Sequence, residues 1–256
     1  RGVSICKTLD DLKKVAEDFF EKKIFGKAGT RAILEQFMPG FEISYTVVTD
    51  GQTYLALPVA QDHKRLLDGD QGPNTGGMGT VAPVILKVGW EEQIKNLIIE
   101  PTLKHMKQRH FLYRGIIFIG VMMTDTGPQV IEYNTRLGDP ETQVILPLIE
   151  GDTAQIFYEL SKGKLIPFKI KKLFATCVIM VAAGYPESPR KGDLISGPLE
   201  QDSPNQWMIH AGTQKLEGQY YTHGGRVLGC VGLGTTLSAS MREAYQLSNL
   251  VHSEGL

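Results

Sequence analysis

The chain has 256 residues, of which 42% are hydrophobic and 21% are charged, ordinary values for a globular protein with one large or two modest domains. Its formal net charge of -1 excludes the basic excess of a nucleic-acid-binding protein. The longest apolar runs, GIIFIGVMM and ATCVIMVAAGY, are shorter than the roughly 20 residues that span a bilayer, so they predict buried strands.

Cysteine usage and the chain ends give two further expectations. Cys6, Cys177 and Cys230 lie far apart without paired spacing, which predicts neither a zinc site nor a disulfide framework and favours a reducing compartment. The chain begins without Met, has no segment that resembles a signal peptide, and stops inside a helical pattern. We therefore expect it to be a piece of a longer polypeptide.

The first predicted element is an amphipathic helix. Thr8 and Asp11 have the residue types of a capping box, and apolar residues recur on one face to about Lys23. RAILEQF (31–37) and the two halves of FEISYTVVTDGQTYLALPVA (41–60) follow as three strand candidates, the last two joined by Asp50-Gly51 in a tight hairpin. A sheet is expected here.

A second helical pattern covers WEEQIKNLIIEPTLKHMKQ (90–108), with Pro101 expected to kink or split it. Two strands then flank an Asp-Thr-Gly turn, and the first is apolar enough to be buried on both faces. Helix returns at 140–164. From Leu173 short strands with frequent Gly and Pro precede a last helix, and the linker-like residues 163–172 predict a domain boundary.

A glycine-dense loop, GPNTGGMG, follows the charged residues DHKR. Four glycines in this stretch suggest that the main chain comes close to something bulky and anionic, with its amides exposed. The acid and the cationic side chains just before the loop are suited to phosphate recognition. The alternative is a flexible surface loop.

Polar residues gather at the end of the strand in QVIEYNTRLGDPETQ. Strand alternation places Val130, Glu132, Asn134 and Arg136 on one face if the strand persists. A carboxylate and an amide oxygen two residues apart are hard ligands, suited to a magnesium ion that bridges nucleotide phosphates. Arg136 would then lie where negative charge develops. Asp139 precedes Pro140 in a turn that should cap the next helix. The alternative for the whole segment is a surface strand with scattered polar residues, followed by an ordinary capped helix.

A break interrupts the strand pattern in ILEQFMPGFEISY. The main chain at Gln36 to Met38 would be free to pair with an adenine edge, and Glu42 would point back toward ribose hydroxyls. A hairpin-like loop explains the same residues equally well.

Taken together, EQFMPGFE, QDHKR, GPNTGGMG and VIEYNTRLGDPETQ occur in an order and spacing that resemble the ATP-grasp core of the glycinamide ribonucleotide synthetase (phosphoribosylamine-glycine ligase) family. MVAAGYP, HAGT and GGRVL resemble its C-terminal domain, so the likeness covers nearly the whole chain. It implies an α+β fold. An ATP-grasp domain of antiparallel sheets and helices would cover 1–165, without the first part of its lid, and a small β-rich domain, truncated at its end, would cover 172–256.

The resemblance implies a cytoplasmic ligase of de novo purine synthesis. Glycine would attack the γ-phosphate of ATP to give glycyl phosphate, and the amine of 5-phosphoribosylamine would displace the phosphate. ATP and Mg²⁺ are the implied cofactors, with Mn²⁺ as an alternative. Relatives often carry further purine-pathway domains in the same polypeptide, so the parent chain is a candidate for such a fusion. Neither nucleic acid nor a membrane is an expected partner. Such phosphoryl transfer needs positioning and charge neutralisation more than a side-chain nucleophile.

The resemblance also assigns roles to individual residues. Glu35, Gln36, Phe37 and Met38 would form the adenine hinge, with Glu42 on the ribose. Glu132 and Asn134 would hold the metal, Arg136 would stabilise the acyl phosphate, and Asp139 would orient glycine or act as a helix cap. The residues implied at the nucleotide phosphates are Arg65 and Asn74, and those implied at phosphoribosylamine are Asp62, Lys64, Thr75, Gly76, Gly77 and Met78.

The chain departs from the family pattern at its start. RGV resembles the tail of the family's glycine-rich lid, so the lid lysine that precedes it is absent and the fragment is expected to be incomplete for turnover. Two alternatives stay open: a nucleotide-binding fragment that is inactive alone, and another ATP-grasp ligase that activates a different carboxylate. His63 and His210 invite a general-base role, although lone histidines are more often packed or solvated.

Overall fold

The computed structural model describes residues 3–200 and 202–255 and divides the chain into two compact units, one ending at Pro39 and one beginning at Gly40. The first two residues of the predicted lid tail, Arg1 and Gly2, lie outside the described residues. Within the part that is described, no helix is both long and apolar enough to cross a bilayer.

The first unit contains the predicted amphipathic helix. α1 (Leu9–Ala16) continues into a π-helical turn, Glu17–Glu21, and a 3-10 turn follows at Gly26–Thr30. The capping box is confirmed: Asp11 N donates to Thr8 Oγ1 at 3.1 Å, and Thr8 N donates to the Asp11 carboxylate at 3.0 Å. Two otherwise unpaired amides at the helix start are thus satisfied.

The strand predicted for residues 31–37 is wrong. Residues 31–39 have no strand partner among the described residues, and Ile33 and Leu34 are 86% and 78% exposed. An apolar run forms a strand only when a neighbouring strand supplies hydrogen bonds, and the described part of the chain supplies none here. The break after Phe37 therefore does not separate two strands.

The second unit contains a four-stranded antiparallel sheet in the order β2-β1-β7-β8. The predicted hairpin between the first two strands is confirmed, but its loop has four residues, because Thr49 pairs with Tyr54. Asp50 accepts hydrogen bonds from the amides of Gln52 and Thr53 at 2.8 and 2.7 Å and so closes the loop. The strands are β1 (Phe41–Thr49), β2 (Tyr54–Ala56), β7 (Gly115–Thr124) and β8 (Gly127–Asn134).

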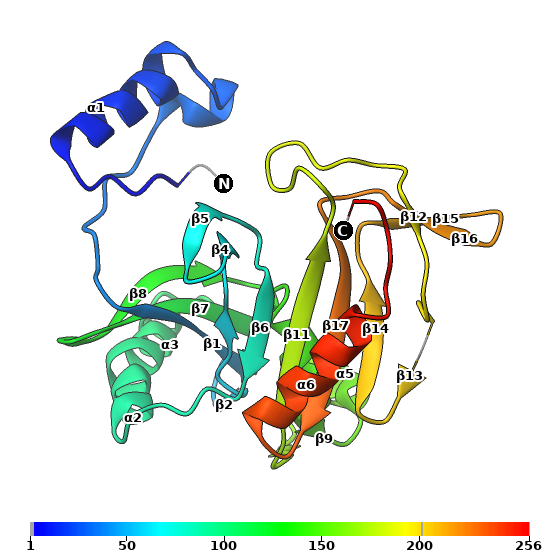
Figure 1. Cartoon of the computed structure of the whole chain (residues 1–256). Coiled ribbons are helices and arrows are strands. Elements are labelled where there is room, and N and C mark those ends of the chain that lie inside the picture. Colours follow the sequence, from blue (N-terminus) through cyan, green and yellow to red (C-terminus); the bar gives the residue numbers. More distant parts are fainter. Residues whose placement is uncertain (1–2, 201, 256) are drawn as a thin grey trace. The chain divides into compact units, whose positions relative to one another are not determined.

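Helices cover one face of this sheet (Figure 1). α2 (Trp90–Ile94) and α3 (Glu100–Gln108) are separated by a π-helical turn at Lys95–Ile99. The predicted interruption near Pro101 is confirmed: proline cannot donate to the carbonyl four residues back, and just before it Glu100 N donates to Lys95 O, five residues back, as in a π-helix. Alternate residues of β1 and β7 pack on these helices. The opposite face of the sheet carries Glu42 and Ser44, and toward its other end Val48 packs in a second hydrophobic cluster.

A β-bulge changes the predicted alternation in β8. Gly120 of β7 pairs with Glu132, and the next residue, Val121, pairs with Val130, so Ile131 is an extra residue. Val130 packs in the core beside the helices, and Tyr133 OH lies 2.8 Å from Thr102 Oγ1 of α3. The prediction that Val130 shares a face with Glu132 is therefore wrong. The strand also ends at Asn134, so Arg136 lies beyond it.

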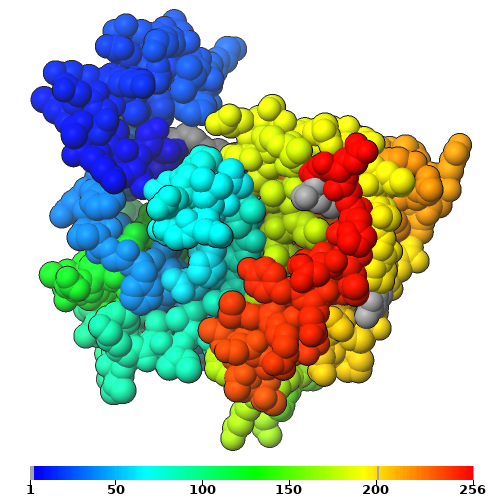
Figure 2. Space-filling model, in the orientation of Figure 1, coloured from blue at the N-terminus to red at the C-terminus, as the bar shows by residue number. Residues whose placement is uncertain are grey.

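A six-stranded antiparallel sheet has the order β13-β14-β17-β11-β6-β3, and α6 (Leu237–Ser248) packs on β17 and β11 (Figure 1). Thr176 of β11 and Ser240 of α6 are buried and hydrogen-bonded at 2.8 Å. The outer side of α6, orange to red in Figure 2, is open at the surface. The strands are β3 (Gln61–Asp62), β6 (Gly79–Ala82), β11 (Phe174–Val181), β13 (Asp202–Ser203), β14 (Gln206–His210) and β17 (Arg226–Gly234).

This sheet joins strands from both sides of the predicted boundary at 163–172, because β6 pairs with β11. The boundary stays a prediction. The remaining helices are short, and three smaller antiparallel sheets complete the unit. These elements are α4 (Thr142–Ile145), α5 (Thr153–Ser161), β4 (Arg65–Leu67), β5 (Gln71–Asn74), β9 (Ile149–Glu150), β10 (Lys169–Ile170), β12 (Leu194–Ile195), β15 (Thr213–Leu216) and β16 (Gln219–Thr222).

Candidate functional site

The glycine-dense loop returns the chain from the exposed hairpin β4–β5 to β6, and its amides are already used. Thr75 N donates to Lys64 O at 2.7 Å, Gly76 N to Tyr185 OH at 2.8 Å, Gly77 N to Thr75 Oγ1 at 3.0 Å and Met78 N to His63 O at 2.8 Å. The prediction that these amides are free to wrap an anion is therefore wrong.

Close packing explains the glycines instead. Gly77 has a φ of +109°, and a Cβ atom there would lie 2.5 Å from Asp62 Oδ1 and 2.6 Å from Pro140 Cδ. At Gly76 a Cβ atom would lie 3.2 Å from the hydroxyl of Tyr185. The loop thus rests directly on side chains from three distant segments, which only residues without a side chain permit.

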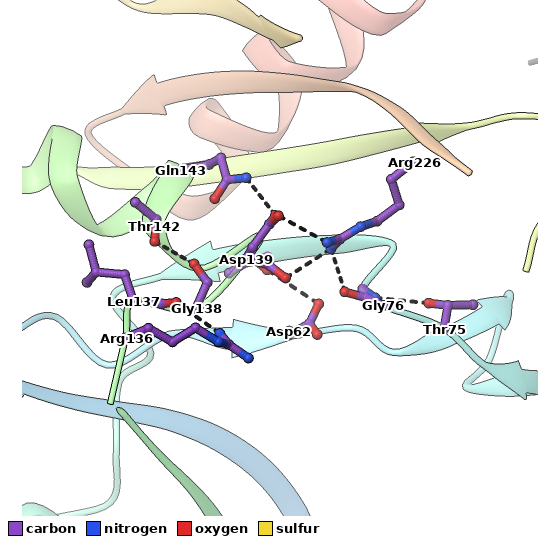
Figure 3. Close-up of polar contacts among 12 residues, drawn as sticks. Asp62, Thr75, Gly76, Arg136, Leu137, Gly138, Asp139, Thr142, Gln143 and Arg226 are labelled. Carbon is purple, nitrogen blue, oxygen red and sulfur yellow. Dashed lines mark hydrogen bonds and ion pairs between the residues drawn. The ribbon is translucent and has the colours of Figure 1, made fainter. Parts of the chain in front are cut away.

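Arg226, the first residue of β17, joins this loop to the RLGDPETQ segment (Figure 3). Its guanidinium donates to Gly76 O and, at 2.9 Å, to Asp139 O, and it pairs with the Asp139 carboxylate at 3.1 Å. Sequence reasoning missed both Arg226 and Tyr185. They belong to GGRVL and MVAAGYP, where the only signal was the resemblance of those segments to the family.

The prediction that Asp139 caps the next helix is wrong. α4 begins at Thr142 with Glu141 at the N-cap position. The Asp139 carboxylate instead accepts a hydrogen bond from Gln143 Nε2 at 2.8 Å and pairs with Arg226 (Figure 3). Its side chain is nevertheless 59% exposed, so the carboxylate is held at both oxygens and is still open to a ligand.

Glu141 is buried beneath the site. It is 4% exposed, and Ser44 Oγ donates to its Oε1 at 2.8 Å. Because a buried carboxylate needs hydrogen-bond partners, this contact ties β1 to the turn before α4. The position of Glu141 directly after Pro140 gives no sign in the sequence of this burial.

Asp62 and Lys64 lie in a cluster of charges. Burial, together with the nearby Glu141 and Glu42 carboxylates, raises the pKa of Asp62 to about 7, although Lys64 and Arg226 oppose this shift. Burial alone would lower the pKa of Lys64, but its ion pair with Glu42 and the charges of Asp62 and Glu141 raise it overall. Two predicted substrate residues and one predicted ribose residue therefore lie together.

Glu132 and Asn134 share the face of the first sheet that the helices leave open. Asn134 Nδ2 donates to Glu132 Oε1 at 3.0 Å, which leaves the amide oxygen available as an acceptor. A Cβ atom at Gly120 would lie 3.4 Å from Glu132 Cγ and 3.6 Å from Glu42 Oε1, so these two acidic side chains border the same residue. Among the described residues, no group of three or more His, Cys, Asp or Glu is placed to hold a metal.

The remaining predicted site residues lie in the β4–β5 hairpin, just after β8, and in the first unit. Arg65 and Asn74 pair across the β4–β5 hairpin, and Arg65 also donates to Gly72 O at 2.7 Å. Arg136 donates to Leu137 O at 3.0 Å. The predicted hinge, Glu35 to Met38, belongs to the first unit.

His210 is packed and hydrogen-bonded, as lone histidines more often are. The ring of His210 contacts Thr213 Oγ1 at 3.0 Å through Nδ1 and Leu199 O at 3.1 Å through Nε2, and it stacks on Tyr220. A ring bound at both nitrogens has a packing role here. His63 contributes its main chain to the loop, through the hydrogen bond from Met78 N.

A cavity of about 690 Å³ adjoins Asp139. Its walls come from the RLGDPETQ segment and the residues after it on one side and from β14 on the other. The lining residues are Leu137, Gly138, Asp139, Thr142, Gln143, Leu146, Pro147, Thr153, Trp207 and Ile209.

Sequence comparisons assign both parts of the chain to one family. Residues 1–142 match the profile of the phosphoribosylglycinamide synthetase ATP-grasp (A) domain, and residues 175–256 match that of the phosphoribosylglycinamide synthetase C domain. A bifunctional purine biosynthetic protein of Schizosaccharomyces pombe is 41% identical over 98% of this chain and 32% of its own length. A phosphoribosylamine-glycine ligase of Leptospira interrogans is 38% identical over 96% of this chain and 58% of its own length.

Solved structures agree with this assignment. A phosphoribosylamine-glycine ligase of Thermotoga maritima superposes with a TM-score of 0.83 and 37% identity over 96% of this chain and 62% of that one. The biotin carboxylase domain of a 2-oxoglutarate carboxylase of Hydrogenobacter thermophilus, crystallised with MgADP, superposes with a TM-score of 0.75 at 14% identity, over 100% of this chain and 55% of that one, and shows the fold alone. The predicted α+β ATP-grasp fold with a following C-terminal domain is confirmed. The chain spans less than two thirds of the length of the ligases that it matches. Because both of its parts match, it belongs to the phosphoribosylglycinamide synthetase family.

Proposed function

We propose that this chain forms part of an ATP-dependent ligase that joins glycine to 5-phosphoribosylamine through glycyl phosphate, in cytoplasmic purine synthesis. The observation that carries the proposal is the convergence of two family-specific segments, the glycine-dense loop and RLGDPETQ, which Arg226 holds against each other. Some relatives are multifunctional purine biosynthetic proteins, which supports a fused parent chain as part of the proposal.

Glu132 and Asn134 fit a magnesium site in this proposal. Their donor set, one carboxylate and one amide oxygen, suits a hard cation that keeps waters and binds phosphate oxygens, and Mn²⁺ accepts similar ligands. When bound, the cation supplies charge neutralisation for the triphosphate. The protein's own part is to hold these two side chains on one face beside Glu42.

The nucleotide would lie along that open face. Glu42 would accept from the ribose hydroxyls, in competition with its ion pair to Lys64. Arg65 and Asn74 would approach the phosphates from the β4–β5 hairpin, where their pairing keeps them side by side. Glu35, Gln36, Phe37 and Met38 stay part of the proposal as the adenine hinge, on the family resemblance alone.

The two substrates would meet around Asp62 and Asp139. Since the loop amides are satisfied internally, an anionic sugar phosphate would take its charge from Lys64, while Thr75, Gly76, Gly77 and Met78 form the wall beside it. Asp139 would orient glycine, and Arg136 would stabilise the acyl phosphate that forms. No protein nucleophile is needed, because the glycine carboxylate itself attacks the phosphate.

Phosphate release by the whole parent polypeptide tests this function. With ATP, Mg²⁺ and phosphoribosylamine present, we expect release to depend on glycine and to be far slower with other small carboxylates, bicarbonate included. Equal rates with another carboxylate would favour a different ATP-grasp ligase. Release that needs no carboxylate, or no release at all, would contradict the ligase proposal.

The fragment itself separates a nucleotide-binding module from an inert fold. Calorimetric titration of the 256-residue chain with ATP and Mg²⁺ should show saturable binding even where turnover needs further parts of the parent. A chain that binds no nucleotide would show that this piece lacks the proposed site.

A further inference from the structure

Arg226 links two distant segments of the candidate site. Its two hydrogen bonds and one ion pair reach two segments that lie 150 and 87 residues away in the sequence. The side chain is 23% exposed, so most of it is withdrawn from water, whereas its partner Asp139 stays 59% exposed. The Arg226 guanidinium is therefore used in contacts within the protein, while the Asp139 carboxylate remains exposed.

Tyr185 completes the contact by binding the main-chain amide of the same residue, Gly76. Gly76 N donates to its hydroxyl at 2.8 Å, while Gly76 O accepts from Arg226. Gly225, next to Arg226, lets the tyrosine ring approach, because a Cβ atom there would lie 2.5 Å from the ring. Both polar groups of one loop residue are thus bound by side chains from the C-terminal part of the chain.

The Asp139 carboxylate is fixed by this arrangement. Gln143 Nε2 holds Oδ1 at 2.8 Å and the Arg226 guanidinium holds Oδ2 at 3.1 Å, so neither oxygen is free to rotate away. Each oxygen keeps acceptor capacity for one more donor. Asp139 and Gln143 also line the cavity of about 690 Å³ that includes Trp207.

We propose that Arg226 is a positioning residue that orients the Asp139 carboxylate toward this cavity to receive the ammonium group of an amino-acid substrate, with Tyr185 locking the adjoining loop. The proposal rests on the proposed ligase function, in which glycine is that substrate. Arginine is suited to this task because its planar fork holds a carboxylate and two carbonyl oxygens at once, which a lysine ammonium cannot do in the same geometry.

The first experiment measures the lock without any ligand. Amide hydrogen exchange at Gly76 in the 256-residue chain should become about tenfold faster in Arg226→Met and in Tyr185→Phe, while the global unfolding midpoint in urea shows that each variant is folded. Arg242→Met, on the open side of α6, is the matched control and should leave the loop unchanged. Unchanged exchange at Gly76 in both variants would overturn the lock.

The second experiment measures substrate positioning in the whole parent polypeptide. Arg226→Met should raise KM for glycine about tenfold and change KM for ATP about twofold or less, because Asp139 loses its orientation while Arg226 contacts none of the proposed ATP residues. Arg226→Lys should recover part of the glycine KM through its remaining charge and leave the loop exchange fast. A merely structural residue would instead lower kcat in proportion to the folded fraction, and that result would overturn the proposal.

Failure of the two proposals can be told apart. A wild-type parent that makes no product from glycine contradicts the ligase function, while the exchange measurement still decides whether Arg226 and Tyr185 lock the loop. A wild-type parent that uses glycine, together with an Arg226→Met variant of unchanged glycine KM, contradicts the positioning role alone.

Discussion

Ser44 Oγ donates a hydrogen bond of 2.8 Å to Glu141 Oε1, and the two residues lie 97 positions apart in the chain. Both are buried, at 3% and 4% exposure. The contact connects the middle of β1 to the turn that carries Asp139, so the sheet with the candidate metal ligands and the segment with the candidate glycine ligand share one fixed point.

Ser44→Ala should therefore destabilise the fold. The substitution leaves a buried carboxylate oxygen without its donor, which costs about 1–3 kcal/mol. Urea unfolding measures the loss, and Ser238→Ala on the exposed part of α6 is the control, expected within about 0.5 kcal/mol of wild type. Equal stability of the two variants would mean that the buried contact contributes nothing.

Gly77→Ala should cost more than backbone strain alone. A Cβ atom at Gly77 would lie 2.5 Å from Asp62 Oδ1 and 2.6 Å from Pro140 Cδ, in addition to the strain of a φ of +109°. Gly192, with a φ of +89° and nothing within 4 Å of a Cβ atom, carries the strain without the contacts. Gly192→Ala should cost about 1–2 kcal/mol and Gly77→Ala clearly more, as measured by urea unfolding; equal costs would contradict the packing account of the loop.

The stability of the chain should depend on pH through Asp62. Its pKa in the folded chain, about 7, lies above the unfolded value of 3.8, so the folded state holds the proton longer, and the free energy of unfolding falls as pH rises from about 4 to about 7. Asn cannot titrate. Asp62→Asn should therefore gain stability relative to wild type over this range.

Urea unfolding at about pH 5 and about pH 8 checks the sign of this effect. The difference in unfolding free energy between Asp62→Asn and wild type should move in favour of the variant at the higher pH. Asp125→Asn, in the exposed turn between β7 and β8, serves as the control. A difference that stays constant, or that moves in favour of wild type, would show that the carboxyl is not held protonated in the fold.

Local signals in the sequence predicted much of the fold. The capping box of Thr8 and Asp11, the Asp50 hairpin and the interruption near Pro101 each depend on residues within a few positions of one another, and all three are present. Strand alternation likewise placed Glu132 and Asn134 on one face. Short-range chemistry decides these features, so the sequence contains them directly.

Long-range contacts decided what the sequence did not predict. The bulge at Ile131 comes from pairing with β7, and it separates Val130 from Glu132. The amides of the glycine-dense loop find acceptors in Lys64, His63 and Tyr185, the last of these 109 residues away. A periodic pattern cannot reveal such partners, because it carries no information about which distant segments meet.

The most direct test of the account is calorimetric titration of ATP into the 256-residue chain with and without Mg²⁺. Mg²⁺ should tighten ATP binding in wild type. Glu132→Ala and Asn134→Ala should each remove most of that gain, since losing even an outer-shell partner weakens metal binding about tenfold or more, while Glu92→Ala, on the exposed side of α2, should keep it. The same Mg²⁺ dependence in all four proteins would contradict the central claim that Glu132 and Asn134 hold the cation.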